Sequence, residues 1–159
     1  MPVIELITRI RCPIEIAFDL SRSIDLHEVS TAHTKEKAVE GRTEGLIELG
    51  ETVTWEATHF GIRQRLTSKI TEYSRPSHFR DSMVRGAFKR FDHYHDFEAD
   101  GEFTIMVDRF DYTAPLGILG RIADVVFLKG YMTRLLERRN ELIRRVAESD
   151  AAQFLDVGS

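Results

Sequence analysis

Apolar and polar residues alternate along much of the chain, and this period of two predicts an antiparallel β-sheet. The first alternating stretch is Val3 to Arg11, which ends before Pro13. Longer strands separated by short turns are predicted at 52–60, 62–73, 79–85, 88–98 and 102–113. The turns contain residues that favour chain reversal, namely Gly61, Arg75-Pro76, Gly86 and Asp100-Gly101. A weak strand at 35–40, followed by a glycine-rich loop or bulged edge, brings the expected sheet to about seven strands.

The last long segment, Leu116 to Ala147, changes to a helical repeat close to 3.6 residues. Its apolar positions are Ile118, Leu119, Ile122, Val125, Val126, Leu128, Met132, Leu135, Leu136, Leu142, Ile143 and Val146. We predict one helix of about eight turns whose apolar stripe the sheet covers. Gly120 and Gly130 interrupt this pattern, so we expect a backbone or a ligand to approach the first half closely. The arginine-rich polar side beyond Tyr131 is expected to be solvated.

Two short helices are predicted between the first strand and the rest of the sheet. Pro13 suits the first turn of one helix, and Ser23 offers an N-cap for a second at 24–29. The order of elements predicts an α+β fold, in which a curved antiparallel sheet wraps around the long C-terminal helix. We expect one domain over residues 1–149 and a frayed tail at 150–159.

Composition and charge exclude several classes of function. The 159 residues carry a net charge of −4 with a pI near 5.9, so there is no electrostatic reason to expect a nucleic-acid partner. A single cysteine, Cys12, excludes an internal disulfide and a thiolate metal cluster, and it suits a reducing compartment such as the cytoplasm. No signal peptide and no transmembrane segment are expected, because no apolar run is long enough.

Side chains of a strand alternate between its two faces, so the pattern also predicts which residues point inward. In 88–98 the inward set is Phe91, His93, His95 and Phe97. The preceding strands are expected to turn inward Val53, Trp55, Ala57, His59, Ile62, Gln64, Leu66, Ser68, Ile70, Phe79, Asp81, Met83 and Arg85. Two sets compete in 102–113, and we favour Met106, Asp108, Phe110 and Tyr112 over Phe103, Ile105 and Val107.

Several short motifs occur in this order along the chain up to about Ala147. They are Pro13 with Phe18, Gly45 through Gly50 leading to Val53 and Trp55, Phe60-Gly61, Phe79, Gly86, Phe91 with His93, His95 and Phe97, then Asp108, Tyr112 and Pro115-Leu116-Gly117. Together they resemble the START and pollen-allergen (SRPBCC) superfamily, especially its bacterial polyketide cyclase/dehydrase-like members. The resemblance implies a helix-grip fold with a cavity between sheet and helix for an apolar or amphipathic small molecule. It does not imply a reaction.

The inward residues define a candidate ligand site. Its apolar lining is predicted to be Trp55, Phe79, Met83, Phe91, Met106 and Phe110, and its polar groups Asp81, Arg85, His93, His95, Asp108 and Tyr112. His59, Ile122, Val126 and Gly130 are expected to border the same space. We interpret Ile118 to Tyr131 as part of the covered helix and as the lid of the cavity mouth. The alternative is that this segment faces a membrane or a partner subunit, since it is apolar on much of its circumference.

His93 and His95 are the residues on which any chemistry would rest, together with Asp108. They can be core histidines paired with carboxylates, the polar patch of a ligand cavity, or a His–Asp general acid/base. Two histidines one residue apart on a strand also suit a metal site if His59 or Asp108 supplies a third ligand. We favour a metal-free pocket without a cofactor. Cys12 has no base placed near it, and no Gly-x-Ser-x-Gly motif occurs.

The sequence therefore predicts a protein, monomeric or homodimeric, that binds a small hydrophobic molecule. A cyclase/dehydratase-type enzyme that uses the His/Asp groups of the cavity is the first alternative. A module that binds a protein partner is the second.

Overall fold

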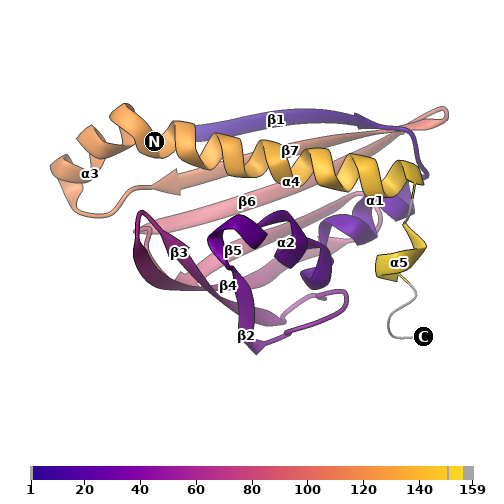
Figure 1. Cartoon of the computed structure of the whole chain (residues 1–159). Helices are drawn as coiled ribbons and strands as arrows, with labels where there is room; N and C mark the ends of the chain where they lie inside the picture. Colours follow the sequence, from indigo (N-terminus) through magenta and orange to yellow (C-terminus); the bar gives the residue numbers. More distant parts are fainter. Residues whose placement is uncertain (1, 150, 156–159) are drawn as a thin grey trace.

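An antiparallel sheet forms the body of the molecule, whose computed structural model describes residues 2–149 and 151–155 (Figure 1). Its strands are β1 (Val3–Ile10), β2 (Lys37–Gly41), β3 (Thr52–His59), β4 (Ile62–Ser74), β5 (His78–Arg85), β6 (Arg90–Asp100) and β7 (Phe103–Thr113). The 7-stranded order is β1-β7-β6-β5-β4-β3-β2. Strands β2 to β7 thus form a meander of sequence neighbours, and β1 closes it by pairing Val3 with Asp111. The predicted seven-stranded antiparallel sheet is confirmed.

Two short helices follow β1, as predicted. Helix α1 (Ile14–Ser21) begins after Pro13, and α2 (Ile24–Ser30) is followed by a 3₁₀ turn, η1 (Ala32–Thr34). Ser23 caps α2, because its hydroxyl accepts a hydrogen bond from the backbone N–H of Leu26 at 3.1 Å. Phe18 of α1 is fully buried and meets Phe79 and Phe97 of the sheet edge-on. These contacts place α1 on one face of the sheet, and His27 places α2 on the same face, where its ring lies 4.2 Å from that of Trp55.

The C-terminal helix lies across the same face and consists of α3 (Gly117–Ala123), a π-helical segment η2 (Asp124–Leu128) and α4 (Lys129–Ser149). Leu136 and Ile143 of α4 are buried against the sheet, so the predicted helix-grip arrangement is confirmed for this half. The first half is different, because α3 extends past the ends of β6 and β7 (Figure 1). Ile118 is 76% exposed there and Val125 85% exposed. The expectation that the sheet covers the whole stripe is therefore wrong for α3 and η2.

The two glycines of this helix have different surroundings. A Cβ at Gly120 would lie 1.7 Å from the carbonyl oxygen of Pro115, so a backbone does approach here, as expected. Gly130 is exposed, and the nearest atom to a Cβ built on it would be Nη1 of Arg134, at 3.5 Å. The expected close approach at Gly130 is absent.

The inward face of β7 is the one that the sequence favoured. Met106, Asp108, Phe110 and Tyr112 are all buried, while their neighbours on the other face are more exposed. The tail differs from its prediction at residues 151–155, where a short helix, α5 (Ala152–Leu155), places Phe154 in the core. Residues 156–159 of the predicted tail lie outside the described part. None of the described helices has the length and apolar character needed to cross a bilayer.

Candidate functional site

A cavity of about 530 Å³ lies between the sheet and the helices α2 and α4. Strands β3 to β7 supply one wall, because their inward positions carry large apolar side chains interrupted by a few polar ones. The predicted residues that line it are Trp55, His59, Phe79, Asp81, Phe91, His93, His95 and Phe110. The cavity has the size and mixed lining of small-molecule sites.

Other predicted site residues do not line this cavity, and each has a local reason. A register shift between β4 and β5 pairs Arg85 with Thr67. Ser68, the next residue of β4, lines the cavity, so Thr67 lies on the opposite face of the strand, and Arg85 is exposed. Met83 is half-buried against the Phe91 and Phe110 cluster. The predictions for Met83 and Arg85 as lining residues are corrected accordingly.

The predictions that four more residues line the cavity are also corrected. Met106 is covered by α1, where its sulfur accepts a hydrogen bond from Ser21 at 3.3 Å. Tyr112 is buried, and its hydroxyl donates a hydrogen bond to Asp124 of η2. Burial raises the pKa of Tyr112 most, and the hydrogen bond raises it further. Ile122 and Val126 lie on the exposed part of the C-terminal helix.

Gly130 likewise lies outside the wall, and Asp108 lies behind it. The cavity wall also includes residues of the C-terminal helix that the sequence analysis did not predict. They are Leu128 at the end of η2, and Tyr131, Met132, Leu135, Leu136 and Arg139 of α4. Most of them belong to the helical apolar stripe, which was the signal available in the sequence. Arg139 gave no such signal, since it stands within an arginine-rich stretch that was expected to be solvated.

The polar end of the cavity is a network of buried ionisable groups. Nε2 of His95 lies 2.9 Å from Oδ2 of Asp81, and Nε2 of His93 lies 2.9 Å from Oδ1 of Asp108. The two imidazole rings lie next to each other, with centroids 3.8 Å apart and an angle of 34° between their planes. Nδ1 of His95 lies 3.3 Å from the same Asp108 oxygen, which is ion-pair distance without hydrogen-bond geometry. One carboxylate therefore contacts both histidines from behind.

Helix α4 fixes that carboxylate from the other side. Asn140 donates to Oδ2 of Asp108 at 2.7 Å, and Nη1 of Arg139 lies 3.4 Å from Oδ1. Arg139 also donates to Oδ1 of Asn140 and to the carbonyl oxygen of Ser21. A buried carboxylate is stable only when its oxygens have such partners. The sequence analysis predicted Asp108 but missed Arg139 and Asn140, which hold it.

The charges of the network are unevenly distributed between the two histidines. Burial lowers the pKa of His93, and the neighbouring His95 lowers it further, against the opposing effect of Asp108. Burial also opposes charge on His95, but contacts with Asp108 and Asp81 outweigh it and raise its pKa. Burial disfavours the charged form of Asp108, yet His93, His95 and Arg139 hold its pKa well below its usual value. The proton therefore favours His95, and Asp108 is ionised.

A second polar group lies at the other end of the cavity. Nδ1 of His59 is 2.6 Å from the hydroxyl of Tyr131, and His27 pairs with Glu36 at 2.7 Å. His59 thus lies away from His93 and His95. Burial lowers the pKa of His59, so this histidine favours its neutral form.

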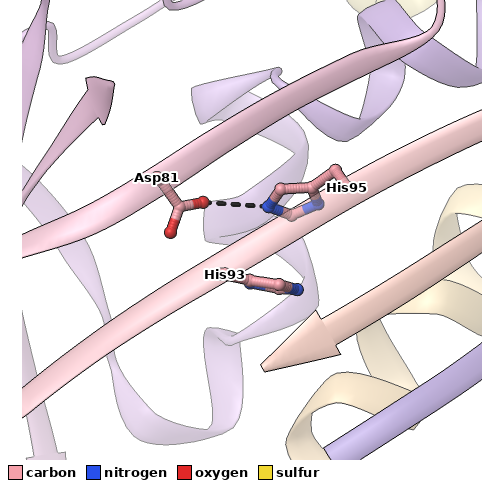
Figure 2. A group of neighbouring side chains, drawn as sticks. All are labelled: Asp81, His93 and His95. Carbon is pink, nitrogen blue, oxygen red and sulfur yellow. Dashed lines mark hydrogen bonds and ion pairs between the residues drawn. The ribbon is translucent and has the colours of Figure 1, made fainter. Parts of the chain in front are cut away.

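Asp81, His93 and His95 also form a set that can hold a metal ion. Each offers one ligand atom, and these atoms lie within 4.8 Å of one another. Figure 2 shows the Asp81 carboxylate directed from β5 at the His95 ring on β6, with His93 beside it. The third member is thus Asp81, and the expectation that His59 or Asp108 supplies it is corrected.

Comparison with known proteins identifies the fold. No protein-family model matches the chain, and no curated protein sequence matches it. Solved structures do match. The protein TTHA0849 from Thermus thermophilus has a TM-score of 0.71 at 18% identity, over 92% of this chain and 99% of that one. A START superfamily protein from Mycobacterium smegmatis has a TM-score of 0.67 at 9% identity, over 90% and 97%.

A plant protein extends the comparison. Major latex-like protein 151 from Panax ginseng has a TM-score of 0.63 at 16% identity, over 91% of this chain and 97% of that one. The protein has a START-like fold. At these identities the likeness concerns the fold, so the site of this START-like protein has to be interpreted from its own residues.

Proposed function

We propose that this START-like protein binds a small, mainly apolar molecule with one polar end. The observation that carries the proposal is the lining of the cavity. Apolar side chains such as Trp55, Phe91 and Leu135 form most of its wall. The buried, ionised His–Asp network occupies one end, whereas His59 at the other end favours its neutral form. An apolar body gains free energy in proportion to the area that leaves water, and a few polar groups fix its orientation.

The test uses a fluorescent apolar anion, 1-anilinonaphthalene-8-sulfonate, and a variant that fills the cavity. Ala57 is a buried lining residue of β3, whereas Thr58, its neighbour, points to the opposite face. We expect Ala57→Phe to abolish enhancement of the dye fluorescence, while Thr58→Phe leaves it unchanged. Thermal melts establish that both variants are folded. Equal enhancement in both variants would refute the cavity as the binding site.

A second function is favoured by the placement of two adjacent imidazoles in the cavity wall, with ring centroids 3.8 Å apart and pKa values shifted in opposite directions. A protonated His95 and a neutral His93 side by side supply a general acid and a general base, as a cyclase/dehydratase-type reaction on a keto or enol group requires. The test is exchange of the α-protons of a cavity-sized aromatic ketone in D₂O, followed by NMR. Wild type should accelerate the exchange, and His93→Gln should not. Binding of the ketone without accelerated exchange would leave only the first function.

Compartment and assembly follow as parts of the same proposal. The free, buried Cys12 supports a reducing compartment, for which the cytoplasm is the default. The cavity is completed within one chain, so a monomer suffices for binding. Light scattering of the purified protein distinguishes this from a homodimer or from a module that needs a protein partner.

A further inference from the structure

We propose that Asp81, His93 and His95 bind a divalent transition-metal ion, such as zinc or iron(II), at the polar end of the cavity. Two imidazoles and one carboxylate are a ligand set that such ions use when further coordination positions stay open to a substrate. All three side chains line the cavity, so the open positions would face a bound molecule. The ligand atoms lie within 4.8 Å of one another. Ligand atoms that are each about 2.0 to 2.2 Å from one ion lie closer together than this, so the three side chains must move slightly toward the ion when it binds.

The groups behind the histidines support this assignment. Metal-bound histidines usually direct their second ring nitrogen at a carboxylate, which fixes the ring. Asp108 occupies that position for both rings, 2.9 Å from Nε2 of His93 and 3.3 Å from Nδ1 of His95. The nitrogens left for a metal are therefore Nδ1 of His93 and Nε2 of His95. Nε2 of His95 already faces the Asp81 carboxylate at 2.9 Å, where a metal ion would replace the shared proton.

A second feature of His95 and the charge balance agree with this replacement. Nδ1 of His95 is buried and makes no hydrogen bond within the described part of the chain. With Nε2 bound to a metal, Nδ1 must carry the proton, and the Asp108 carboxylate lies at ion-pair distance from it, 3.3 Å. A metal ion that displaces the Nε2 proton of His95 would keep positive charge beside the carboxylates of Asp81 and Asp108, of which Asp108 also pairs with the buried Arg139.

Titration of metal-stripped protein with Co²⁺ tests the site, because a histidine–carboxylate site gives cobalt visible absorption bands. We expect one equivalent per chain, displaced by Zn²⁺, and a rise in melting temperature of the wild type with Zn²⁺. His95→Gln and Asp81→Asn should lose the bands. Asp108→Asn should weaken binding by about 10- to 100-fold, since it acts through the histidines.

The matched control is His78, which lies between Asp96 and Glu72 on the exposed side of the sheet. His78→Gln should bind Co²⁺ as the wild type does. The proposal is overturned if wild type shows no stoichiometric binding and no thermal shift, or if His78→Gln removes the bands and His95→Gln keeps them. Neither outcome affects the dye-binding test, so the metal site and the proposed cavity function fail independently.

A different observation carries a second inference, the exposed apolar surface of α3 and η2. We name it the α3 apolar face and define it by Ile118, Leu119, Ile122, Val125, Val126 and Phe127, which are 53% to 85% exposed. Phe60 of the β3–β4 turn extends it, because its ring lies 6.0 Å from that of Phe127 and 4.6 Å from that of Tyr131. Phe60 and Tyr131 also line the cavity, so the α3 apolar face is continuous with the cavity rim.

We infer that the α3 apolar face docks on the surface of an anionic lipid bilayer. The exposed charged residues between 115 and 134 are Arg121, Lys129 and Arg134, all cations. The acid within that range, Asp124, is buried and accepts the Tyr112 hydroxyl. An apolar face flanked by cations suits the acyl and headgroup layers of such a bilayer. A second copy suits it less, because a symmetric contact would bring the cations of two copies together. Docking here would open the proposed cavity toward lipid, from which an apolar ligand can enter.

Flotation with vesicles of phosphatidylcholine mixed with phosphatidylglycerol tests this docking. We expect the wild type to float with them, and the double variant Leu119→Gln with Val126→Gln to bind more than about tenfold more weakly. The control pair Leu49→Gln with Val84→Gln removes apolar side chains of similar exposure elsewhere and should bind as the wild type does.

Two further measurements test the role of the cations in docking and the alternative that a second copy covers the α3 apolar face. Arg121→Glu with Lys129→Glu should remove the preference for phosphatidylglycerol over pure phosphatidylcholine vesicles. A wild type that does not float overturns the proposal. A wild-type dimer that becomes a monomer in the Leu119→Gln, Val126→Gln variant assigns the face to a second copy instead. Retained dye binding by a protein that does not float would show that the cavity proposal stands without this one.

Discussion

Replacing Asp108 by Asn is the most direct probe of the buried network. The carboxylate is fully buried and lies 2.7 Å from Asn140, 2.9 Å from His93 and 3.4 Å from Arg139. The variant keeps the size of the side chain, removes its charge and turns one oxygen into a donor that faces other donors. Arg139 would keep only the neutral oxygens of Asn140 and Ser21. Breaking one side of a buried ion pair costs about 3 to 5 kcal/mol, and we expect Asp108→Asn to lose that much stability.

Urea unfolding at neutral pH, followed by circular dichroism, measures the loss. The control is Asp111→Asn on the same strand, where the partially exposed ion pair with Arg90 should contribute about 0 to 1 kcal/mol. Asp108→Asn should cost less when Arg139→Met is also present, with a coupling energy of about 0.5 to 3 kcal/mol. A loss below about 1 kcal/mol for Asp108→Asn, or additive losses in the double variant, would refute the network as described.

The pKa direction of Asp108 also fixes the pH range of its contribution. Its folded pKa is held below the unfolded value of about 3.9, so the contribution is complete above that pH. It is lost as the pH falls from there through the folded pKa. The wild type and Asp108→Asn should therefore converge in stability only under acid conditions below about pH 3.9.

Five further substitutions, in three groups, test the helix and His95 by the same unfolding assay. Leu136→Ala should cost about 2 to 5 kcal/mol because the side chain is buried, whereas Leu119→Ala should change stability by less than about 0.5 kcal/mol. Equal losses would contradict the difference between the two halves. Gly120→Ala should destabilise, since its Cβ would lie 1.7 Å from a backbone oxygen, and Gly130→Ala should stabilise by up to about 1 kcal/mol. Because the pKa of His95 is raised, its contribution is complete below about pH 6.5 and lost as the pH rises through the folded pKa. His95→Gln should remove this loss of stability at rising pH. A pH profile of stability that is the same in His95→Gln and in the wild type would contradict the prediction.

The sheet was predictable because strand faces alternate strictly. Tight turns at Gly61 and Gly101 then determined the order of strands, whereas the inward set of β7 had to be chosen between two competing patterns of apolar positions. The rotation of side chains about the C-terminal helix was harder to predict. Arg138 and Arg139 are neighbours in an arginine-rich stretch, yet the first is exposed and the second is buried beside Asp108. Only the carboxylate on a distant strand distinguishes them.

The candidate site was predicted in part for the same reason. His93 and His95 were found because they share a face with Phe91 and Phe97. Asp81 was found too, but its pairing with His95 depends on the alignment of two strands, which the sequence does not state. The exposed α3 apolar face was misplaced because an apolar helical stripe predicts burial unless the supporting sheet is known to end before it.

The pairing of β1 with β7 has a consequence for biosynthesis. Val3 leaves the ribosome about 100 residues before its partner Asp111, an interval that at 5 to 20 residues per second is roughly 5 to 20 s. During that interval the apolar side of β1, including Ile4 and Ile10, has no strand beside it. Helix α4, which supplies the opposite wall of the cavity, emerges later still. The nascent chain is thus most open to aggregation, and to capture by chaperones, until α4 is released.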